Sequence, residues 1–165
     1  MTWHVIHTKP KQEKRALENL QKQDFECFLP SCSIEKIRRG RITVSSEPLF
    51  PRYLFINLKQ GTNWTPIRST LGVQNLVKFG TEAAKVPDDL IETLRTIEDR
   101  VQSSNPERLF SKGDKVQIIS GPFAGLEGIY QMTDGETRAM VLIELLRKPA
   151  KGHFEITQLR KIGGR

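Results

Sequence analysis

Short apolar runs separated by polar turns predict an alternation of strands and helices along the first part of the chain. Residues 12–23 are expected to form a helix, because Ala16, Leu17 and Leu20 make a narrow apolar stripe at helical spacing. A second helix is expected to begin near Pro87, where acidic residues follow in the first turn. The runs that predict strands are residues 3–8, 25–29, 33–46 (as a hairpin), 49–58 and 73–79, and a short helix is expected within 61–71. This order of elements is typical of an α+β sandwich.

The run 49–58 is the most strand-like of these and carries two alternating pairs of apolar side chains. Tyr53 and Phe55 share one face of the expected strand, and Leu54 and Ile56 share the other. One face could therefore pack in the core while the other forms an apolar docking patch. From the residues alone, core packing of Tyr53 and Phe55 is favoured over docking.

A polar stretch divides the chain into two parts. Residues 102–107 read Q-S-S-N-P-E, which is typical of a linker. We expect an N-terminal domain over residues 1–101, a linker over 102–112 and a C-terminal domain over 113–165. The second domain has only about 55 residues, close to the lower limit for independent folding.

Composition limits the classes of function that fit the chain. Its 165 residues carry a formal net charge of +7, which permits nucleic-acid binding, although the basic residues are spread over both halves. No apolar run approaches the roughly 18 residues of a membrane helix, and the N-terminus does not resemble a signal peptide. We therefore expect a cytoplasmic protein without membrane attachment, and a monomer.

The residues that usually carry enzyme chemistry are few and poorly spaced. His4, His7 and His153 have no partner at the spacing of a nucleophile or a metal site. Cys27 and Cys32 lack the spacing of a zinc site and are expected to be reduced thiols. The chain also lacks the glycine-rich signatures of phosphate-binding loops. We expect neither catalysis nor a bound metal or cofactor.

Two clusters of basic residues are candidates for contact with nucleic acid. The expected hairpin carries R-R-G-R at positions 38–41, its tip. Lys9, Lys11 and Arg15 lie around the start of the first helix and could flank single-stranded DNA. For each cluster, a solvated surface and a phosphate contact both remain open.

Two segments carry a family resemblance. Residues 113–128 read G-D-K-V-Q-I-I-S-G-P-F-A-G-L-E-G and resemble a KOW motif, the small barrel module of elongation factors and some ribosomal proteins. Residues 46–56 read S-E-P-L-F-P-R-Y-L-F-I and resemble the polymerase-binding domain of NusG-type factors. Nearly the whole chain is similar to that family. The segment D-G-E-T-R-A-M at 134–140 is more similar to its specialised RfaH group than to the housekeeping group.

The resemblance implies three sets of binding residues. Those that would line the apolar pocket for the clamp helices of the RNA polymerase β′ subunit are Tyr53 and Phe55. Those that would meet the gate loop of the β subunit are Asn63, Trp64 and Thr65. Those that would contact nontemplate-strand DNA are Lys9, Arg15, Asn19, Thr70 and Leu71. The chain departs from the family pattern at two of these positions, because a His is expected in place of Asn63 and a basic residue in place of Leu71.

The resemblance also implies a C-terminal domain with two folds. Closed, it is an α-helical hairpin that masks the polymerase site; open, it is a five-stranded KOW barrel that can bind a small-subunit ribosomal protein. By resemblance, a salt bridge between Glu47 and Arg138, which we name the interdomain latch, would hold the closed form.

The residues of the C-terminal domain fit both folds. Thr133 and Glu136 match a capping box, and residues 138–148 contain good helix formers. The same D-G pair at 134–135 fits a hairpin turn between strands. The residues that oppose a helix over 115–131 are Gly121, Pro122, Gly125 and Gly128. Gly125 and Gly128 could instead supply backbone freedom at a barrel turn. The closed form is favoured.

The resemblance therefore implies a transcription elongation and antitermination factor. It would bind the polymerase clamp helices and nontemplate DNA, suppress pausing and termination in long operons, and couple transcription to translation. Two alternatives remain. One is a general NusG-type factor with a permanently open barrel, and the other is an RNA- or ribosome-binding KOW protein.

Overall fold

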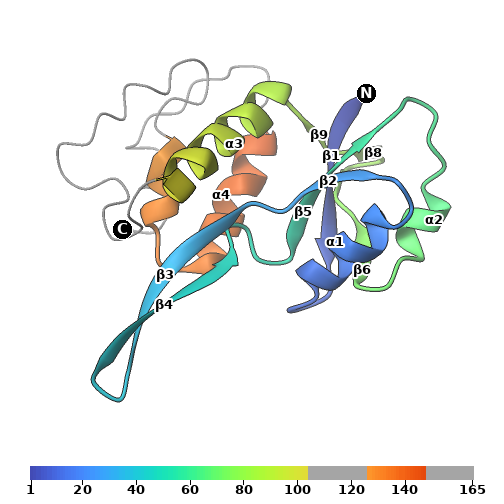
Figure 1. Ribbon diagram of the computed structural model, residues 1–165. Coiled ribbons are helices and arrows are strands. Elements are labelled where there is room, and N and C mark those ends of the chain that lie inside the picture. Colours follow the sequence, from blue (N-terminus) through green and yellow to red (C-terminus); the bar gives the residue numbers. More distant parts are fainter. Residues whose placement is uncertain (104–125, 148–165) are drawn as a thin grey trace.

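A five-stranded antiparallel sheet lies at the centre of the part of the chain that the structure describes. The structure is a computed structural model that describes residues 1–103 and 126–147 (Figure 1). Strand β1 (Thr2–Thr8) is central, with β5 (Tyr53–Leu58) on one side and β2 (Glu26–Phe28) beyond it. On its other side β1 pairs with β6 (Val73–Leu76) near its end and with β9 (Lys85–Val86) near its start.

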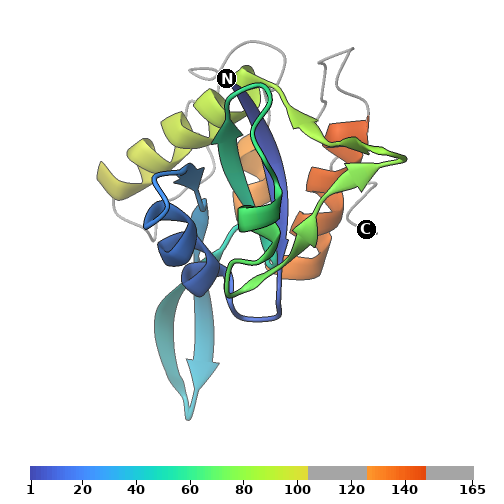
Figure 2. The ribbon, with the colours of Figure 1, turned by 90° about the vertical axis from the view of Figure 1, so that its right-hand side faces the viewer.

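Helices cover both faces of this sheet. They are α1 (Glu13–Gln21), α2 (Thr65–Arg68), α3 (Asp88–Ser103), α4 (Gly135–Arg147) and the 3-10 helix η3 (Leu126–Gln131). Figures 1 and 2 show α3 and α4 on one side of the sheet and α1 and α2 on the other. None of the described helices is long and apolar enough to cross a membrane. The α+β organisation expected for this region is confirmed.

Alternation along the central strands creates two separate cores. Ile6 and Leu54 point toward α1 and α2, where they meet Ala16, Leu20 and Ile67. Val5 and Phe55 point the other way and pack with α3, η3 and α4. The side chains of α3 and α4 in this second core are Leu90, Ile91, Leu94, Ile97, Val141, Leu142, Leu145 and Leu146. Strand β5 is thus buried on both faces, as its continuous apolar sequence requires.

Two predicted strands differ in extent from those observed. The run 49–58 begins as a strand only at Tyr53, because the chain first turns at Phe50, whose carbonyl accepts a hydrogen bond from the Tyr53 amide at 3.0 Å. Arg52, in this turn, has a φ of 72°. The run 73–79 is interrupted at Val77, whose amide donates to the Val5 carbonyl. The rest of it forms β7 (Lys78–Phe79), which pairs with β8 (Glu82–Ala83).

A two-stranded ribbon extends from the body (Figure 1). It consists of β3 (Ser31–Arg38) and β4 (Arg41–Pro48), and it is longer than the hairpin expected over 33–46. Arg39 and Gly40 connect the strands with φ values of 53° and 75°. Positive φ at both loop residues defines a type I′ turn, whose twist matches that of the strands.

The C-terminal residues that the structure describes are helical. Helix α3 includes Gln102 and Ser103, which the sequence had placed in the linker. Gly128, expected at a barrel turn, lies in η3. Helix α4 is capped by Asp134 and not by Thr133, because the Asp134 carboxylate accepts hydrogen bonds from the Glu136 amide at 3.3 Å and the Thr137 hydroxyl at 2.6 Å. The remaining expectations for 104–125, including Gly121, Pro122 and most of the KOW motif, and for 148–165 lie outside the described residues.

Gly72 fixes the distance between α1 and β6. Its φ is 94°, and a Cβ at this position would lie 2.8 Å from the Ala16 amide nitrogen. The Lys9 amide also donates to the Gly72 carbonyl at 2.9 Å. Only glycine combines this backbone conformation with such a close helix.

We predict that Gly72→Ala lowers the free energy of unfolding by about 2–4 kcal/mol, through left-handed strain and the overlap with α1. Urea unfolding of the full chain measures the loss. Gly61→Ala is the matched control, because its φ is 82° but nothing lies within 4 Å of the added Cβ. The control should lose only about 1 kcal/mol. Equal losses for both variants would show that the overlap with Ala16 does not contribute to the loss of stability.

Candidate functional site

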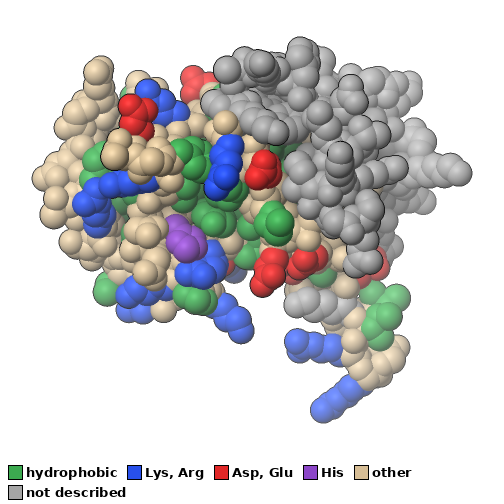
Figure 3. Space-filling model, turned by 180° about the vertical axis from the view of Figure 1, so that it is seen from behind, with side chains coloured by type: hydrophobic (Ala, Val, Ile, Leu, Met, Phe, Trp, Pro, Cys, Tyr) green, Lys and Arg blue, Asp and Glu red, His purple; other side chains and the backbone are tan. Residues whose placement is uncertain are grey.

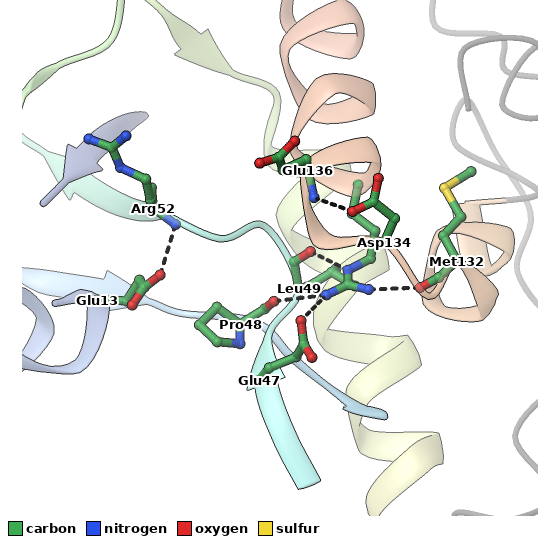
Figure 4. Close-up of polar contacts among 9 residues, drawn as sticks. Glu13, Glu47, Pro48, Leu49, Arg52, Met132, Asp134 and Glu136 are labelled. Carbon is green, nitrogen blue, oxygen red and sulfur yellow. Dashed lines mark hydrogen bonds and ion pairs between the residues drawn. The ribbon is translucent and has the colours of Figure 1, made fainter. Parts of the chain in front are cut away.

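A fully buried guanidinium joins α4 to the end of β4 and to the turn that follows it. Arg138 Nη2 lies 2.6 Å from Glu47 Oε2, and Nε donates to the Leu49 carbonyl at 2.7 Å (Figure 4). Nη1 donates to the Met132 carbonyl at 2.7 Å, and Nη2 also approaches the Pro48 carbonyl at 3.4 Å. The Arg138 side chain is 0% exposed and that of Glu47 is 27% exposed. Each guanidinium nitrogen therefore has an acceptor, as a buried charge requires.

The first turn of α4 lies close enough to the end of β4 for Arg138 to reach these acceptors. Gly135 is the first residue of the helix, and a Cβ there would lie 2.7 Å from Pro51 Cγ and 3.5 Å from Glu47 Oε2. The absence of a side chain lets the first turn press against the β4–β5 turn. The pKa of Asp134 is lowered, mainly by the hydrogen bond from the Thr137 hydroxyl, so the capping carboxylate is ionised at neutral pH.

The two aromatic residues expected at the clamp-helix pocket lie on the face of β5 that packs with α4. Phe55 is 1% exposed and belongs to the same core cluster as Val141 and Leu145. Tyr53 is half-buried, packs against the edge of that cluster and stacks on His7, with ring centroids 5.0 Å apart. In this structure, α4 covers the apolar face that these aromatics would offer to a partner.

Several titratable groups in or beside the two cores have shifted pKa values. Burial raises the pKa of Cys27 to about 12 and that of Cys32 to about 11, so both are protonated, unreactive thiols. Burial also raises the pKa of Glu98, whose carboxylate accepts a hydrogen bond from the Ser31 amide. Burial lowers the pKa of His4 and His7, which favours neutral rings. Among the described residues, no group of three or more His, Cys, Asp or Glu could hold a metal ion.

The segment expected at the gate loop lies on the other side of the sheet, at the start of α2. Asn63 and Thr65 are exposed, and the Asn63 carboxamide oxygen accepts a hydrogen bond from the Thr65 amide at 3.0 Å. Trp64 packs against the opposite core and meets the His4 ring edge-on at 5.1 Å. A hollow of about 490 Å³ beside Trp64 has Lys59 and Lys85 in its lining. The structure therefore separates this segment from Tyr53 and Phe55.

The five residues expected to contact DNA are brought to the junction of α1, the α2–β6 turn and the end of β1. The Asn19 side-chain amide donates to the Leu71 carbonyl at 3.4 Å, and Arg15 lies one turn earlier on α1. Lys9 and Arg15 are exposed, and Leu71 is 60% exposed. Thr70 is buried, and its hydroxyl donates to the Pro66 carbonyl at 2.8 Å. Thr70 thus supports the turn, and its exposed neighbours form the surface.

Some residues that shape these sites were missed in the sequence. Gln23 donates to the Thr70 hydroxyl at 2.8 Å and so fixes the turn that carries Leu71. Gly135 and Pro51 set the approach of α4, and Asp134 caps that helix. Of these residues, only the role of Asp134 could have been predicted from the sequence, because Asp is as good a helix N-cap as Thr.

Comparisons with known proteins all point to NusG proteins. A family model described as "Transcription termination factor nusG" matches residues 1–95. The chain is 25% identical over 179 residues to the transcription termination/antitermination protein NusG of Thermus thermophilus, covering 96% of this chain and 97% of the relative. It is also 25% identical to the NusG proteins of Pseudomonas aeruginosa and Bacillus subtilis, covering 97% of this chain and 98% of each relative.

We predict that Glu47→Gln loosens α4 without altering the rest of the fold. The variant keeps the acceptor oxygen but leaves the buried guanidinium without a countercharge, a change worth about 1.5–3 kcal/mol. Hydrogen exchange of the α4 amides should accelerate about 10- to 100-fold, because 1.4 kcal/mol is tenfold in an opening equilibrium.

Glu26→Gln is the matched control for this experiment. Glu26 pairs with Arg95 at 3.6 Å, but both side chains are about half exposed, at 50% and 46%. A surface pair of this kind contributes less than about 1 kcal/mol, so α4 exchange should not change. Unchanged α4 exchange in Glu47→Gln would contradict the importance of the buried charge pair.

Proposed function

The chain belongs to the NusG family, and from that premise we propose that it is an RfaH-like transcription antitermination factor regulated by its own C-terminal segment. In this proposal, the face of β5 that carries Tyr53 and Phe55 binds the clamp helices of the RNA polymerase β′ subunit. Helix α4 competes for that face. The observation that carries the proposal is the buried Arg138, which holds α4 over Phe55 through three acceptors at the end of β4 and in the turn that follows it.

The composition of the covered face supports a docking role. Phe50 meets Phe55 edge-on with centroids 6.2 Å apart, and Phe28 stacks near it at 6.1 Å. Removing α4 would expose this group of aromatic rings beside the half-buried Tyr53. Aromatic clusters of this kind are common at the centre of protein interfaces, where a few residues contribute most of the binding energy.

The interdomain latch in this proposal is the Glu47–Arg138 pair. A buried pair contributes little net stability relative to apolar residues, but removing one partner is costly. Such a pair therefore favours one arrangement of α4 strongly while leaving the closed and open states close in energy. A partner that engages Glu47 or the β5 face could shift that balance.

Two further surfaces complete the proposed contacts with the elongation complex. Asn63, Trp64 and Thr65, on the side of the sheet opposite to α4, are proposed to meet the gate loop of the β subunit. The surface formed by Lys9, Arg15, Asn19, Thr70 and Leu71 is proposed to contact the nontemplate strand. Binding across two polymerase subunits would stabilise one polymerase conformation, which is how a factor without chemistry suppresses pausing.

The open state extends the proposal. Released from the N-terminal domain, the C-terminal domain would form a KOW barrel that binds a small-subunit ribosomal protein and couples transcription to translation. The main alternative is a general NusG-type factor with a permanently open barrel. It is favoured by the full-length similarity to proteins named NusG, and it gives α4 no competing role.

We predict that the intact chain binds a β′ clamp-helix fragment weakly and that Glu47→Gln strengthens binding about 10-fold or more, because the docking face is uncovered more often. In the Glu47→Gln background, Tyr53→Ala should weaken binding by at least about 10-fold, the effect of losing an aromatic hot spot. Calorimetric titration of the purified proteins measures both effects.

The matched control is again Glu26→Gln, which should bind as the wild type does. Equal and appreciable binding by wild type and Glu47→Gln would favour the general NusG-type factor. No binding by either, together with no effect of Tyr53→Ala in pull-downs of whole polymerase, would refute the polymerase assignment and favour the RNA- or ribosome-binding protein.

A further inference from the structure

The turn that leads into β5 has a backbone conformation that its sequence does not favour. The Tyr53 amide donates to the Phe50 carbonyl at 3.0 Å, which closes a β-turn over residues 50–53. The proline ring fixes a negative φ at Pro51, and Arg52 has a φ of 72°. This combination defines a type II turn, whose third residue is usually glycine. An arginine there is strained, because its Cβ crowds the backbone in the left-handed region.

A type I turn is the alternative that an arginine at this position would favour. Both types can keep the hydrogen bond between the outer residues, and they differ by a flip of roughly 180° of the central peptide. Here that peptide joins Pro51 to Arg52, so the flip reverses the direction of the Arg52 N–H. A group that accepts a hydrogen bond from this N–H therefore selects one type of turn over the other.

The acceptor is a buried carboxylate on a different element. Glu13, the first residue of α1, is 8% exposed, and its Oε2 accepts a hydrogen bond from the Arg52 amide at 2.9 Å (Figure 4). The end of β1 holds the same residue, because the Thr8 amide donates to the Arg52 carbonyl at 2.8 Å and Arg52 Nε donates to the Thr8 carbonyl at 3.1 Å. A flipped peptide would point the Pro51 carbonyl at Glu13, which sets one acceptor against another. Glu13 therefore favours the type II turn.

The turn adjoins both groups that are proposed to compete for the β5 face. Tyr53 ends the turn and stacks on His7, with ring centroids 5.0 Å apart. On the side of α4, a Cβ at Gly135 would lie only 2.7 Å from Pro51 Cγ. The orientation of the peptide between Pro51 and Arg52 therefore affects where Tyr53 lies and how closely α4 approaches.

The turn is also accessible to a partner. Pro51, Arg52 and Tyr53 are each half-buried, so part of every side chain meets solvent. Seen from behind, hydrophobic side chains gather among those of Lys and Arg on the described part of the surface (Figure 3). The Glu13 side chain is covered by comparison. A partner at this surface would touch the turn and not the carboxylate that holds it.

We propose that Glu13 is a positioning residue for the polymerase-binding face, because its carboxylate holds the Pro51–Arg52 peptide in the type II orientation that presents Tyr53. The inference rests on the proposed docking role of the β5 face and assigns the geometry of that face to a residue of α1, on the opposite side of the sheet. A non-glycine residue in the left-handed region disfavours its turn by a factor of roughly 5–30. Loss of the Glu13 acceptor would release that preference.

The first test observes the turn by NMR of the full chain. In a type II turn, ψ near about +120° at Pro51 brings its Hα close to the Arg52 amide proton, and a type I turn moves the two protons apart. We predict a strong nuclear Overhauser effect between them in the wild type and in Glu13→Gln, which keeps an acceptor oxygen. The effect should weaken in Glu13→Leu, which has none. Its absence in the wild type would overturn the proposal without any substitution.

The second test measures binding of the β′ clamp-helix fragment by calorimetric titration. All variants carry Glu47→Gln, so that α4 covers the docking face less often. Glu13→Leu should weaken binding by about 5- to 30-fold, the strain that the acceptor no longer offsets. Glu18→Leu is the matched control, because it makes the same substitution at an exposed position of α1 and should bind as the reference does. Equal weakening by both variants would overturn the assignment to Glu13.

A second substitution separates positioning from a general loss of stability. Arg52→Gly removes the strain at a φ of 72°, so the type II turn no longer depends on Glu13. Added to Glu13→Leu, it should restore most of the affinity. Arg52→Ala removes the same side chain but keeps the Cβ, and it should restore none. Equal affinities of the two double variants would overturn the proposal.

The outcomes also distinguish this inference from the proposed function. If Tyr53→Ala weakens binding and Glu13→Leu does not, the β5 face is a docking site and the role of Glu13 is overturned. If neither substitution weakens binding, the docking function itself fails and the positioning role fails with it. Thermal unfolding of each variant confirms that it is folded at the temperature of the titration.

Discussion

The arrangement of the C-terminal helix depends on a single buried cation. Arg138 has lost all contact with water, and a charge in that state is tolerated only when acceptors surround it. Its acceptors come from the end of β4, from the turn that follows it and from the chain just before α4. Those groups converge only if α4 begins against Pro51, which Gly135 permits. The apolar contacts of α4 are not directional, whereas the hydrogen bonds of the guanidinium are, so they favour the one register of α4 in which Phe55 is covered.

The same strand that carries the covered face also explains why a removable cover is compatible with a stable domain. Leu54 and Ile56 point into a core closed by α1 and α2. Helix α1 is held there by the close approach of Gly72 and by the hydrogen bond from the Arg52 amide to Glu13. Phe55 points into a core closed partly by α3 and partly by α4. Loss of α4 would leave one core complete and the other partly covered. The proposed regulation therefore requires local opening and no unfolding of the N-terminal domain.

Sequence reasoning succeeded where the determining signal was local. Apolar spacing was sufficient for α1 and for β1, and the continuous run after Phe50 was sufficient for β5. It failed where contacts between residues far apart in the sequence determine the local backbone conformation. A positive φ at Arg52 is not encoded by a glycine; it is held by the Glu13 carboxylate, which accepts from the Arg52 amide at 2.9 Å. The close approach at Gly135 likewise depends on a residue distant in sequence. The short strands β7 to β9 are too brief to show any periodicity.

The distribution of surfaces over the fold also constrains how the proposed factor could act. The α4-covered face and the α2 segment lie on opposite sides of the central sheet, so one partner of ordinary size cannot occupy both. A large assembly with protein and nucleic-acid components can, and each contact then needs only modest affinity, because the first bound site raises the effective concentration of the others. A small binder of this kind gains specificity from geometry. In the proposed factor, the sheet that holds these surfaces apart is then as important as the side chains that it carries.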